Sequence, residues 1–315
     1  MEQEPIVIAS ATPVVSLALL VLTATGALAA ETSTRKLSVG GAERSYILSR
    51  PATKDPRPTI IVLHGGTLDA QNALRTTGFE ALVDREQVVA VYPDAIAGHW
   101  NDGRSGAKDR WQTGNETDVA FIRALVATLL QLGLADPQRI YVTGPSNGGM
   151  MTLRLVCEAA DLFAAAAPII ANLSADLVPR CQPPRPIPVL VMNGTADPLM
   201  PFGGGEVGLR HARGQVISTE ETMALLRKVD GCADTPRIEH LPDTNPSDGS
   251  NVTVESWTNC SSGAPVVLYR VDGGGHRVPR RNQPARPVMD RTLGKANGDF
   301  EAADAIWAFF KDKTR

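Results

Sequence analysis

The chain has 315 residues, which is enough for one large domain or two small ones. Hydrophobic residues make up 43% and charged residues 21%, a balance that permits a packed core and is not typical of long disordered regions. The net charge of −3, with no run of Lys or Arg, argues against a nucleic-acid partner, which would require a basic stripe. We therefore expect a globular protein that does not bind nucleic acid.

The N-terminal segment differs from the rest and predicts a secretory signal peptide over residues 1–29. Residues 6–30 carry no charge, Ala27-Leu28-Ala29 is a small-residue cleavage pattern, and a polar stretch follows. Glu2 and Glu4 stand where a signal peptide usually has Lys or Arg, so either the natural start lies further downstream or the segment is an uncleaved membrane anchor. We expect cleavage, and hence an extracellular or periplasmic protein without a stable membrane partner.

Four cysteines fit an exported protein, in which disulfides can form: Cys157, Cys181, Cys232 and Cys260. They allow three connectivities, and the sequence alone does not choose among them. The pairs Cys157–Cys181 and Cys232–Cys260 are favoured because each brackets a loop-rich segment, and buried free thiols are the alternative. No C-x-x-C spacing is present, so neither a zinc site nor a redox motif is expected.

In chain order, the first element after the signal segment is a hairpin over residues 36–51, in which two alternating runs flank the turn Gly40-Gly41. Short apolar runs bounded by Gly or Pro then predict buried strands, and runs with a 3.6-residue period predict helices. For one helix the sequence carries a signal at each end: a capping box of Ser218 and Glu221 at the N-terminus and a glycine stop, Gly231, at the C-terminus. Strands are expected at 59–63, 88–92, 139–143, 162–170, 187–194, 251–258 and 266–275, and helices at 70–86, 118–133, 147–158, 218–231 and 300–313.

The alternation of strands and helices predicts the fold class. Continuous apolar strands linked by amphipathic helices indicate an α/β protein, with a mostly parallel central sheet covered by helices on both faces. No break in composition marks a second domain. We expect one domain over residues 30–315.

A serine lies at the tip of one expected strand, in Gly144-Pro145-Ser146-Asn147-Gly148. This G-x-S-x-G pattern between a strand and a helix is typical of a nucleophile elbow, in which a sharp turn raises the serine hydroxyl above the sheet. Glycines are needed at both flanking positions because Cβ atoms there would collide. The helix N-terminus below favours developing negative charge. The alternative is a serine that only caps the helix.

A serine hydroxyl needs a base, and His276 is the best candidate among the five histidines. Three glycines precede it in a loop after the last core strand, so the chain can turn sharply and carry the imidazole across the top of the sheet. His240 lies in a strand-like run, and His99 and His211 lie on polar loops. None of those three has a comparable context.

The base in turn needs a carboxylate that orients it and stabilises the imidazolium. Asp197 follows a core strand at the carboxyl end of the sheet. Asp272 is the rival, but it is too close in sequence to His276 for the usual geometry. The order Ser146, Asp197, His276 is the one found in α/β-hydrolases.

The developing oxyanion needs preorganised donors. The Asn147 amide comes with the elbow, and a second amide is expected from the loop after strand 59–63, where Gly66 is the first choice and Thr67 the next. His64 begins this loop, and we expect it to support the loop rather than transfer a proton.

With these residues assembled, the chain resembles the polyhydroxybutyrate depolymerase-like and feruloyl-esterase-like group of secreted α/β-hydrolases. The likeness runs from about residue 44 to the C-terminus, and SNGGMM (146–151) and GTADPLMP (194–201) are its specific segments. It implies an α/β-hydrolase fold and cleavage of carboxylic esters through an acyl-serine without metal or cofactor. It also implies Ser146 as nucleophile, Asp197 as orienting acid and His276 as base, and the two favoured disulfides resemble those of the family.

Two positions depart from the family pattern, and one loop invites two interpretations. Val278 stands where a tryptophan is common, so an aromatic wall beside the base is expected to be missing, and Pro145 replaces a leucine-like residue in the elbow. Trp100 lies on a long polar loop at the carboxyl edge of the sheet, together with Asn101, Asp102 and Arg104. It either stacks on a substrate ring or buries its own indole as a loop anchor.

We expect a secreted serine esterase that acts on hydroxyalkanoate oligomers or other small esters, with Trp100 and Thr67 as candidate substrate-binding residues. A feruloyl or acetylxylan esterase and a peptidase are alternatives within enzymes. A non-catalytic exported binding protein with this fold is the alternative from another class. The expected partner is a small-molecule or oligomeric ester.

Overall fold

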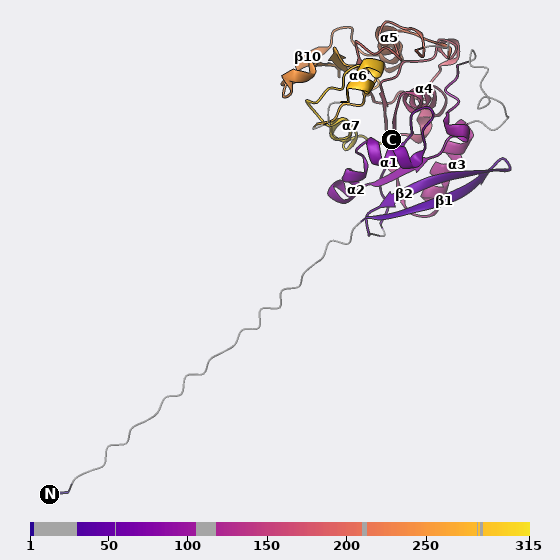
Figure 1. Ribbon diagram of the computed structural model, residues 1–315. Helices are drawn as coiled ribbons and strands as arrows, with labels where there is room; N and C mark the ends of the chain where they lie inside the picture. The colour runs from indigo at the N-terminus through magenta and orange to yellow at the C-terminus, as the bar shows by residue number, and fades with distance from the viewer. Residues whose placement is uncertain (3–29, 54, 105–117, 210–212, 282, 284–285) are drawn as a thin grey trace.

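Figure 1 shows the computed structural model of the chain, which describes residues 1–2, 30–53, 55–104, 118–209, 213–281, 283 and 286–315. The cleavage motif and apolar run of the predicted signal peptide lie outside the described residues, as does His211. The described residues after Ala30 are arranged around one large sheet (Figure 1).

The sheet has ten strands in the order β1-β2-β4-β3-β5-β6-β7-β12-β11-β10. The central strands from β4 to β12 pair in parallel, whereas β1, β2, β11 and β10 pair antiparallel at the two ends. This is the mostly parallel sheet that the sequence predicts. The strands are β1 (Glu31–Val39), β2 (Ala42–Arg50), β3 (Arg57–Val62), β4 (Val89–Pro93), β5 (Ala135–Pro145), β6 (Ala165–Ile169), β7 (Val189–Gly194), β10 (Arg237–His240), β11 (Asn251–Trp257) and β12 (Val266–Asp272), and β8 (Gly205–Glu206) pairs with β9 (Gln215–Val216) outside the sheet.

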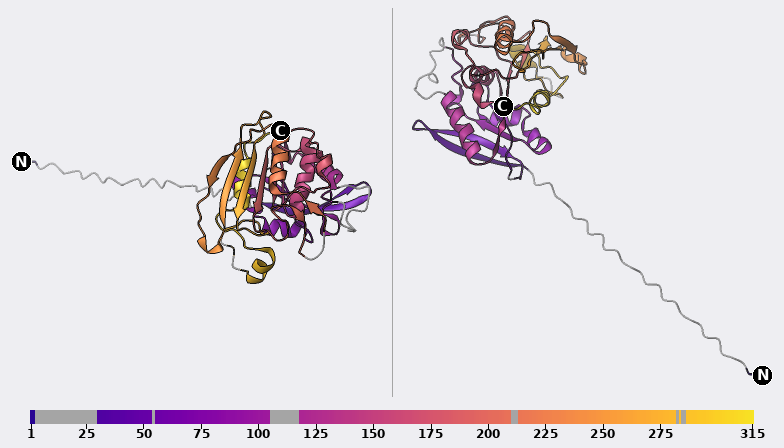
Figure 2. Two further views of the ribbon diagram at one scale, coloured as in Figure 1. Left: turned by 90° about the horizontal axis from the view of Figure 1, so that it is seen from above. Right: turned by 180° about the vertical axis from the view of Figure 1, so that it is seen from behind.

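Helices cover both faces of the sheet, as the two views in Figure 2 show. One face packs against α3, α4 and α5, and the other against α1, α2 and α7. None of the helices in the described ranges combines the length and the apolarity needed to cross a bilayer. The helices are α1 (Ala70–Thr76), α2 (Glu80–Glu86), α3 (Asp118–Gln131), α4 (Asn147–Ala159), α5 (Thr219–Asp230), α6 (Pro287–Leu293) and α7 (Ala302–Phe310).

Alternation along the strands divides the core in two. Because successive side chains of a strand point to opposite faces, Ile61 packs with the α4 side while Ile60 and Val62 pack with the α7 side. The same split separates Val142 from Tyr141 on β5. Buried on both faces, such strands are apolar throughout, which is why their sequence shows continuous runs rather than alternation.

Two helices differ from the sequence prediction. The predicted helix 70–86 is two helices, because the chain turns at Gly78 with φ of 86°, a conformation that disfavours residues with a side chain. The short helix α6 was not predicted, since its seven residues show no apolar period. The capping box of Ser218 and Glu221 and the left-handed stop at Gly231 are confirmed.

Both favoured disulfides are present, Cys157–Cys181 and Cys232–Cys260. The first ties the end of α4 to the loop before β7, and the second joins the segment after α5 to the turn between β11 and β12. Each crosslink restrains the unfolded chain and so favours the folded state.

Candidate active site

Ser146 occupies the sharp turn between β5 and α4 with φ of 58° and ψ of −122°, a strained conformation for a residue with a side chain. Its amide donates to Ile169 O at 2.9 Å, which holds the turn against β6. A Cβ atom on Gly144 would lie 2.5 Å from Leu63 O and 3.0 Å from the carbonyl carbon of Gly148. The glycines are therefore required by close backbone approach, and the serine side chain does not cap its helix.

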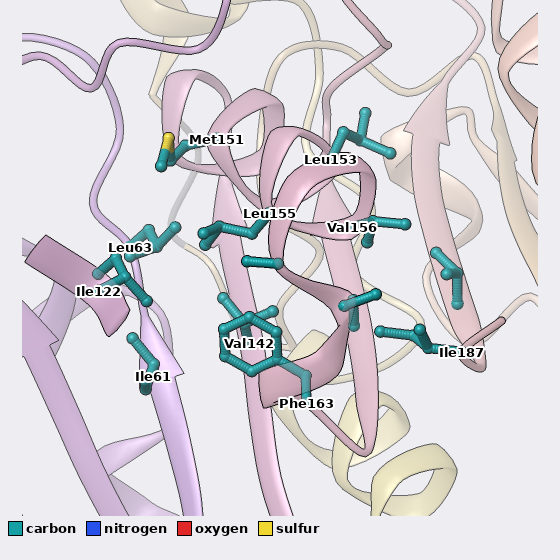
Figure 3. Close-up of a cluster of buried hydrophobic side chains, with 14 of the residues drawn as sticks. Ile61, Leu63, Ile122, Val142, Met151, Leu153, Leu155, Val156, Phe163 and Ile187 are labelled. Atoms are coloured by element: carbon teal, nitrogen blue, oxygen red, sulfur yellow. The ribbon is translucent and has the colours of Figure 1, made fainter. Parts of the chain in front are cut away.

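Hydrophobic packing below the turn fixes this geometry. Figure 3 shows Met151 and Leu155 of α4 in one buried cluster with Ile61 and Leu63 from the neighbouring strand segment. All four side chains are fully buried. Burial of each large apolar side chain contributes about 1.5–3 kcal/mol, which outweighs the roughly 1–3 kcal/mol of backbone strain at Ser146.

The three residues predicted as a triad meet at the carboxyl edge of the sheet. His276 Nε2 lies 2.8 Å from Ser146 Oγ, and His276 Nδ1 lies 2.7 Å from Asp197 Oδ2. An ionised carboxylate can only accept, so Nδ1 carries the proton and donates to Asp197. Nε2 is then free to accept the proton of the serine hydroxyl, as a general base must.

Asp197 is held rigidly in the loop after β7. Its Oδ1 accepts hydrogen bonds from the amides of Leu199 and Met200, both at 2.8 Å, which leaves Oδ2 directed at the imidazole. The rival, Asp272, instead forms an ion pair with Arg270 at 3.1 Å. Of the two carboxylates, only Asp197 contacts His276.

Two backbone amides are available beside the serine. No acceptor is recorded for the amides of Gly66 and Asn147 among the described residues, and both residues line the same cavity as Ser146. The Thr67 amide is already used, because it donates to Gly98 O at 2.8 Å. This favours Gly66 over Thr67 as the second oxyanion donor. His99 packs against this loop, 3.1 Å from where a Cβ atom of Gly66 would lie.

Trp100 is a loop anchor rather than a substrate-binding residue. Its side chain is 1% exposed, its indole donates to His64 O at 3.0 Å, and it is not among the described residues that line the cavity. The Asn147 side chain is hydrogen-bonded to the same loop, since it accepts from Trp100 N and donates to the Asp102 carboxylate. The structure therefore favours the loop-anchor interpretation of Trp100, because its indole is buried against His64 and its N–H is bonded to the His64 carbonyl.

His64 supports the loop, as the sequence predicts. Its Nε2 accepts from Ala95 N at 3.0 Å, so Nδ1 carries the proton and donates to Gly65 O at 2.8 Å. Burial lowers the pKa of His64, which keeps the ring neutral. His240 lies on the edge strand β10 and contacts Thr253, away from the serine.

A cavity of about 670 Å³ opens over the serine, and Thr67, Ser146, Asn147 and His276 all line it. Its apolar lining includes Met150, Ile170 and Val278. No group of three or more potential metal ligands occurs in the described part of the chain.

The cavity is lined by a group of arginines, of which the sequence pointed only to Arg104. Six arginines line it: Arg104, Arg213, Arg277, Arg280, Arg281 and Arg286. Arg277, Arg280, Arg281 and Arg286 follow His276 closely in sequence, which was the available signal. Arginines on a surface loop are common, however, and only the fold shows that these face a cavity.

Comparison with known proteins identifies esterases among the relatives of this chain. The model of the prolyl oligopeptidase family matches residues 81–178. The chain is 34% identical over 284 residues to "Putative esterase NocK" of Nocardia uniformis subsp. tsuyamanensis, covering 85% of this chain and 81% of that protein. It is 32% identical to "Probable feruloyl esterase C" of Aspergillus flavus, covering 85% of this chain and 84% of that protein.

Among solved structures, the acetyl xylan esterase from Aspergillus awamori superposes with a TM-score of 0.53 at 16% identity, covering 82% of this chain and 98% of that one. At this identity the likeness shows a shared fold. The sequence relatives show the family as well as the fold, because they match along most of their length at more than 30% identity. The chain thus belongs to the esterase-like α/β-hydrolases.

Proposed function

We propose that the protein is an exported serine carboxylic-ester hydrolase that works through an acyl-serine intermediate. The contact that carries the proposal is the unbroken chain Ser146 Oγ to His276 Nε2 at 2.8 Å and His276 Nδ1 to Asp197 Oδ2 at 2.7 Å. Each member is held in place by its own loop, so the serine is poised for reaction without rearrangement.

In the acylation step, Ser146 Oγ attacks the ester carbonyl carbon while its proton passes to His276 Nε2. The amides of Gly66 and Asn147 stabilise the negative oxygen of the tetrahedral intermediate. When the bond to the leaving oxygen breaks, His276 returns the proton to the departing alcohol. Asp197 stabilises the imidazolium between these transfers.

Deacylation repeats the same proton path with water. A water molecule gives a proton to His276 Nε2 and attacks the acyl-serine carbonyl carbon. Collapse of the second tetrahedral intermediate breaks the bond to Ser146 Oγ, which takes the proton back. The acid leaves, and the site returns to its starting state.

The proposed substrates are hydroxyalkanoate oligomers or other small esters. A cavity of about 670 Å³ suits a ligand of that size. A feruloyl or acetylxylan ester is the second candidate, favoured by the names of the relatives. Val278 beside the base, in place of an aromatic residue, supports the smaller, non-aromatic esters. Export is supported by the two disulfides and by the predicted signal peptide.

The experiment that tests this proposal is Ser146→Ala. We expect the variant to lose hydrolysis of 4-nitrophenyl acetate by about 1,000-fold or more, and to lose labelling by a fluorophosphonate probe, with its circular dichroism unchanged. Ser33→Ala, on the exposed hairpin strand β1, is the matched control and should behave as the wild type. A folded wild type that neither reacts with the probe nor hydrolyses the ester would instead support the binding-protein hypothesis.

A further inference from the structure

The cavity over Ser146 has a charge opposite to that of the whole chain. The net charge of the chain is −3, yet the six arginines of the lining face no lining Asp or Glu among the described residues. A cleft of one sign with apolar walls concentrates ligands of the other sign. The lining therefore points to a negatively charged substrate.

Three of the six arginines are neutralised by neighbours. Arg104 pairs with the buried Asp102 at 2.6 Å, and Arg277 pairs with Asp290 at 2.8 Å. Arg280 lies 3.6 Å from Glu301. These ion pairs give three of the arginines a structural role, because a guanidinium that is removed from water must be paired and hydrogen-bonded.

The guanidinium groups of the other three form no ion pair within 4.0 Å in the described ranges: Arg213, Arg281 and Arg286. Arg281 Nε donates to a backbone carbonyl, that of Asp299, at 3.1 Å. Among the described residues, the Arg286 guanidinium has one hydrogen-bond partner, Met289 Sδ at 3.6 Å, and the Arg213 guanidinium has none. All three are exposed, so their charge is offered to the solvent that fills the cavity.

Arg213 and Arg286 come from two separate segments of the lining. Arg213 precedes β9, next to the loop that carries Val207 and Gly208, while Arg286 precedes α6, on the segment that leads from His276. A guanidinium presents several N–H donors in a plane that matches the two oxygens of a carboxylate. Two unpaired guanidinium groups in one cavity thus supply both charge and hydrogen bonds for such a group.

A linear oligomer of a hydroxy acid carries this group by necessity. Each of its internal esters has a hydroxyacyl part on one side and, at the far end of the alcohol part, a free carboxylate. An acetyl ester of a neutral sugar or an alkyl ferulate has no such charge. We propose that Arg213 and Arg286 bind the terminal carboxylate of the alcohol part, and that the preferred substrates are short hydroxy-acid oligomers. This inference rests on the proposed serine esterase function.

The test compares two matched substrates, the linear dimer of 3-hydroxybutyrate and its terminal primary amide. We expect wild-type kcat/KM to be about tenfold higher for the acid, mainly through KM, and we expect this ratio to fall in 0.5 M NaCl because ions screen an exposed charge pair. The double variant Arg213→Gln/Arg286→Gln should bring the ratio close to one. Circular dichroism and thermal unfolding report whether the variant is folded.

Arg291→Gln is the matched control, since Arg291 is an exposed arginine of α6 that does not line the cavity. Its acid-to-amide ratio should equal that of the wild type. A wild-type ratio of one or less, or a folded double variant that keeps the full ratio, would overturn the inference. If the wild type does hydrolyse 4-nitrophenyl acetate but shows no preference for the acid, only this inference fails. If the wild type hydrolyses neither 4-nitrophenyl acetate nor the hydroxybutyrate dimer, the proposed function fails together with this inference.

Discussion

The two sides of the cavity are built in different ways. The catalytic side, formed by Gly66, Ser146 and Asn147, rests on buried parallel strands and α4. The arginine side, formed by Arg277, Arg280, Arg281 and Arg286, lies on a loop and at the start of a short helix.

This difference assigns a separate task to each side: the catalytic side carries out the reaction, and the arginine side selects the substrate. Backbone hydrogen bonds and buried neighbours hold the catalytic side, so its atoms stay within the short distances that proton transfer requires. On the arginine side, the side chains of Arg281 and Arg286 are exposed, and exposed side chains adapt to a ligand and tolerate substitution. We expect changes on the first side to affect kcat and changes on the second to affect KM.

The largest effect is expected from Asp197→Asn. An asparagine in this position can present its NH₂ group to the imidazole and favour the wrong tautomer, as in other serine triads. Steady-state kinetics should show kcat for 4-nitrophenyl acetate lower by about 1,000- to 10,000-fold, with little change in KM.

The control for this variant is Asp272→Asn, the carboxylate that is nearest to His276 in sequence. Asp272 pairs with Arg270 rather than with the imidazole, so kcat should remain within about twofold of wild type. Equal losses in the two variants would contradict the assignment of Asp197.

An intermediate effect is expected from Gly66→Ala. The new Cβ would lie 3.1 Å from His99 Nε2, so either the His99 ring or the loop has to shift by a few tenths of an ångström. Because His99 is buried, we expect the loop to shift and to displace the Gly66 amide from the oxyanion. Loss of one oxyanion donor costs up to about 100- to 1,000-fold, and a displaced donor should cost about 10- to 100-fold in kcat. Gly203→Ala is the matched control, because a Cβ there meets nothing within 4 Å, and it should leave kcat unchanged. A Gly66→Ala enzyme with wild-type kcat would remove this amide from the proposed mechanism.

The smallest effect concerns stability rather than rate. Asp230, the last residue of α5, is not among the described residues that line the cavity, and burial raises the pKa of its carboxyl from 3.8 to about 7. Between pH 4 and pH 7 the unfolded chain has lost this proton while the folded protein still holds it. The folded state therefore loses stability as the pH rises through this window.

Asp230→Asn removes that titration. Relative to wild type, its free energy of unfolding should rise between pH 4 and pH 8, by on the order of 2 kcal/mol, in urea denaturation at several pH values. The pH profile of kcat should be the same in both proteins. A stability difference that does not change with pH would show that Asp230 titrates normally, and a shifted kcat profile would show that this region is coupled to the site.

Much of the catalytic side could be predicted from the sequence because its residues obey local rules. The elbow pattern, the glycines before His276 and the carboxylate after β7 each follow a strand end, and parallel strands bring their carboxyl ends to one edge. The hairpin about Gly40-Gly41 and the caps of α5 were predictable for the same local reasons.

Other features depended on contacts between distant segments. Trp100 was assigned either to substrate or to its own loop, and only the partners of its indole and amide, His64 and Asn147, decide between them. The break at Gly78 was missed because the apolar period continues through it. The arginines were missed because nothing in a single loop shows that Arg286 and Arg213 line the same cavity.

The sequence by itself determined the strands, the nucleophile turn and the order of the three reactive residues, since hydrophobic period and backbone sterics act between near neighbours in the chain. Only the tertiary structure decided which carboxylate contacts His276, which amides are free and which charges lack a partner. These properties depend on distances between groups far apart in sequence, here 79 residues from Asp197 to His276 and 130 from Ser146 to His276, and such distances exist only after the sheet has assembled.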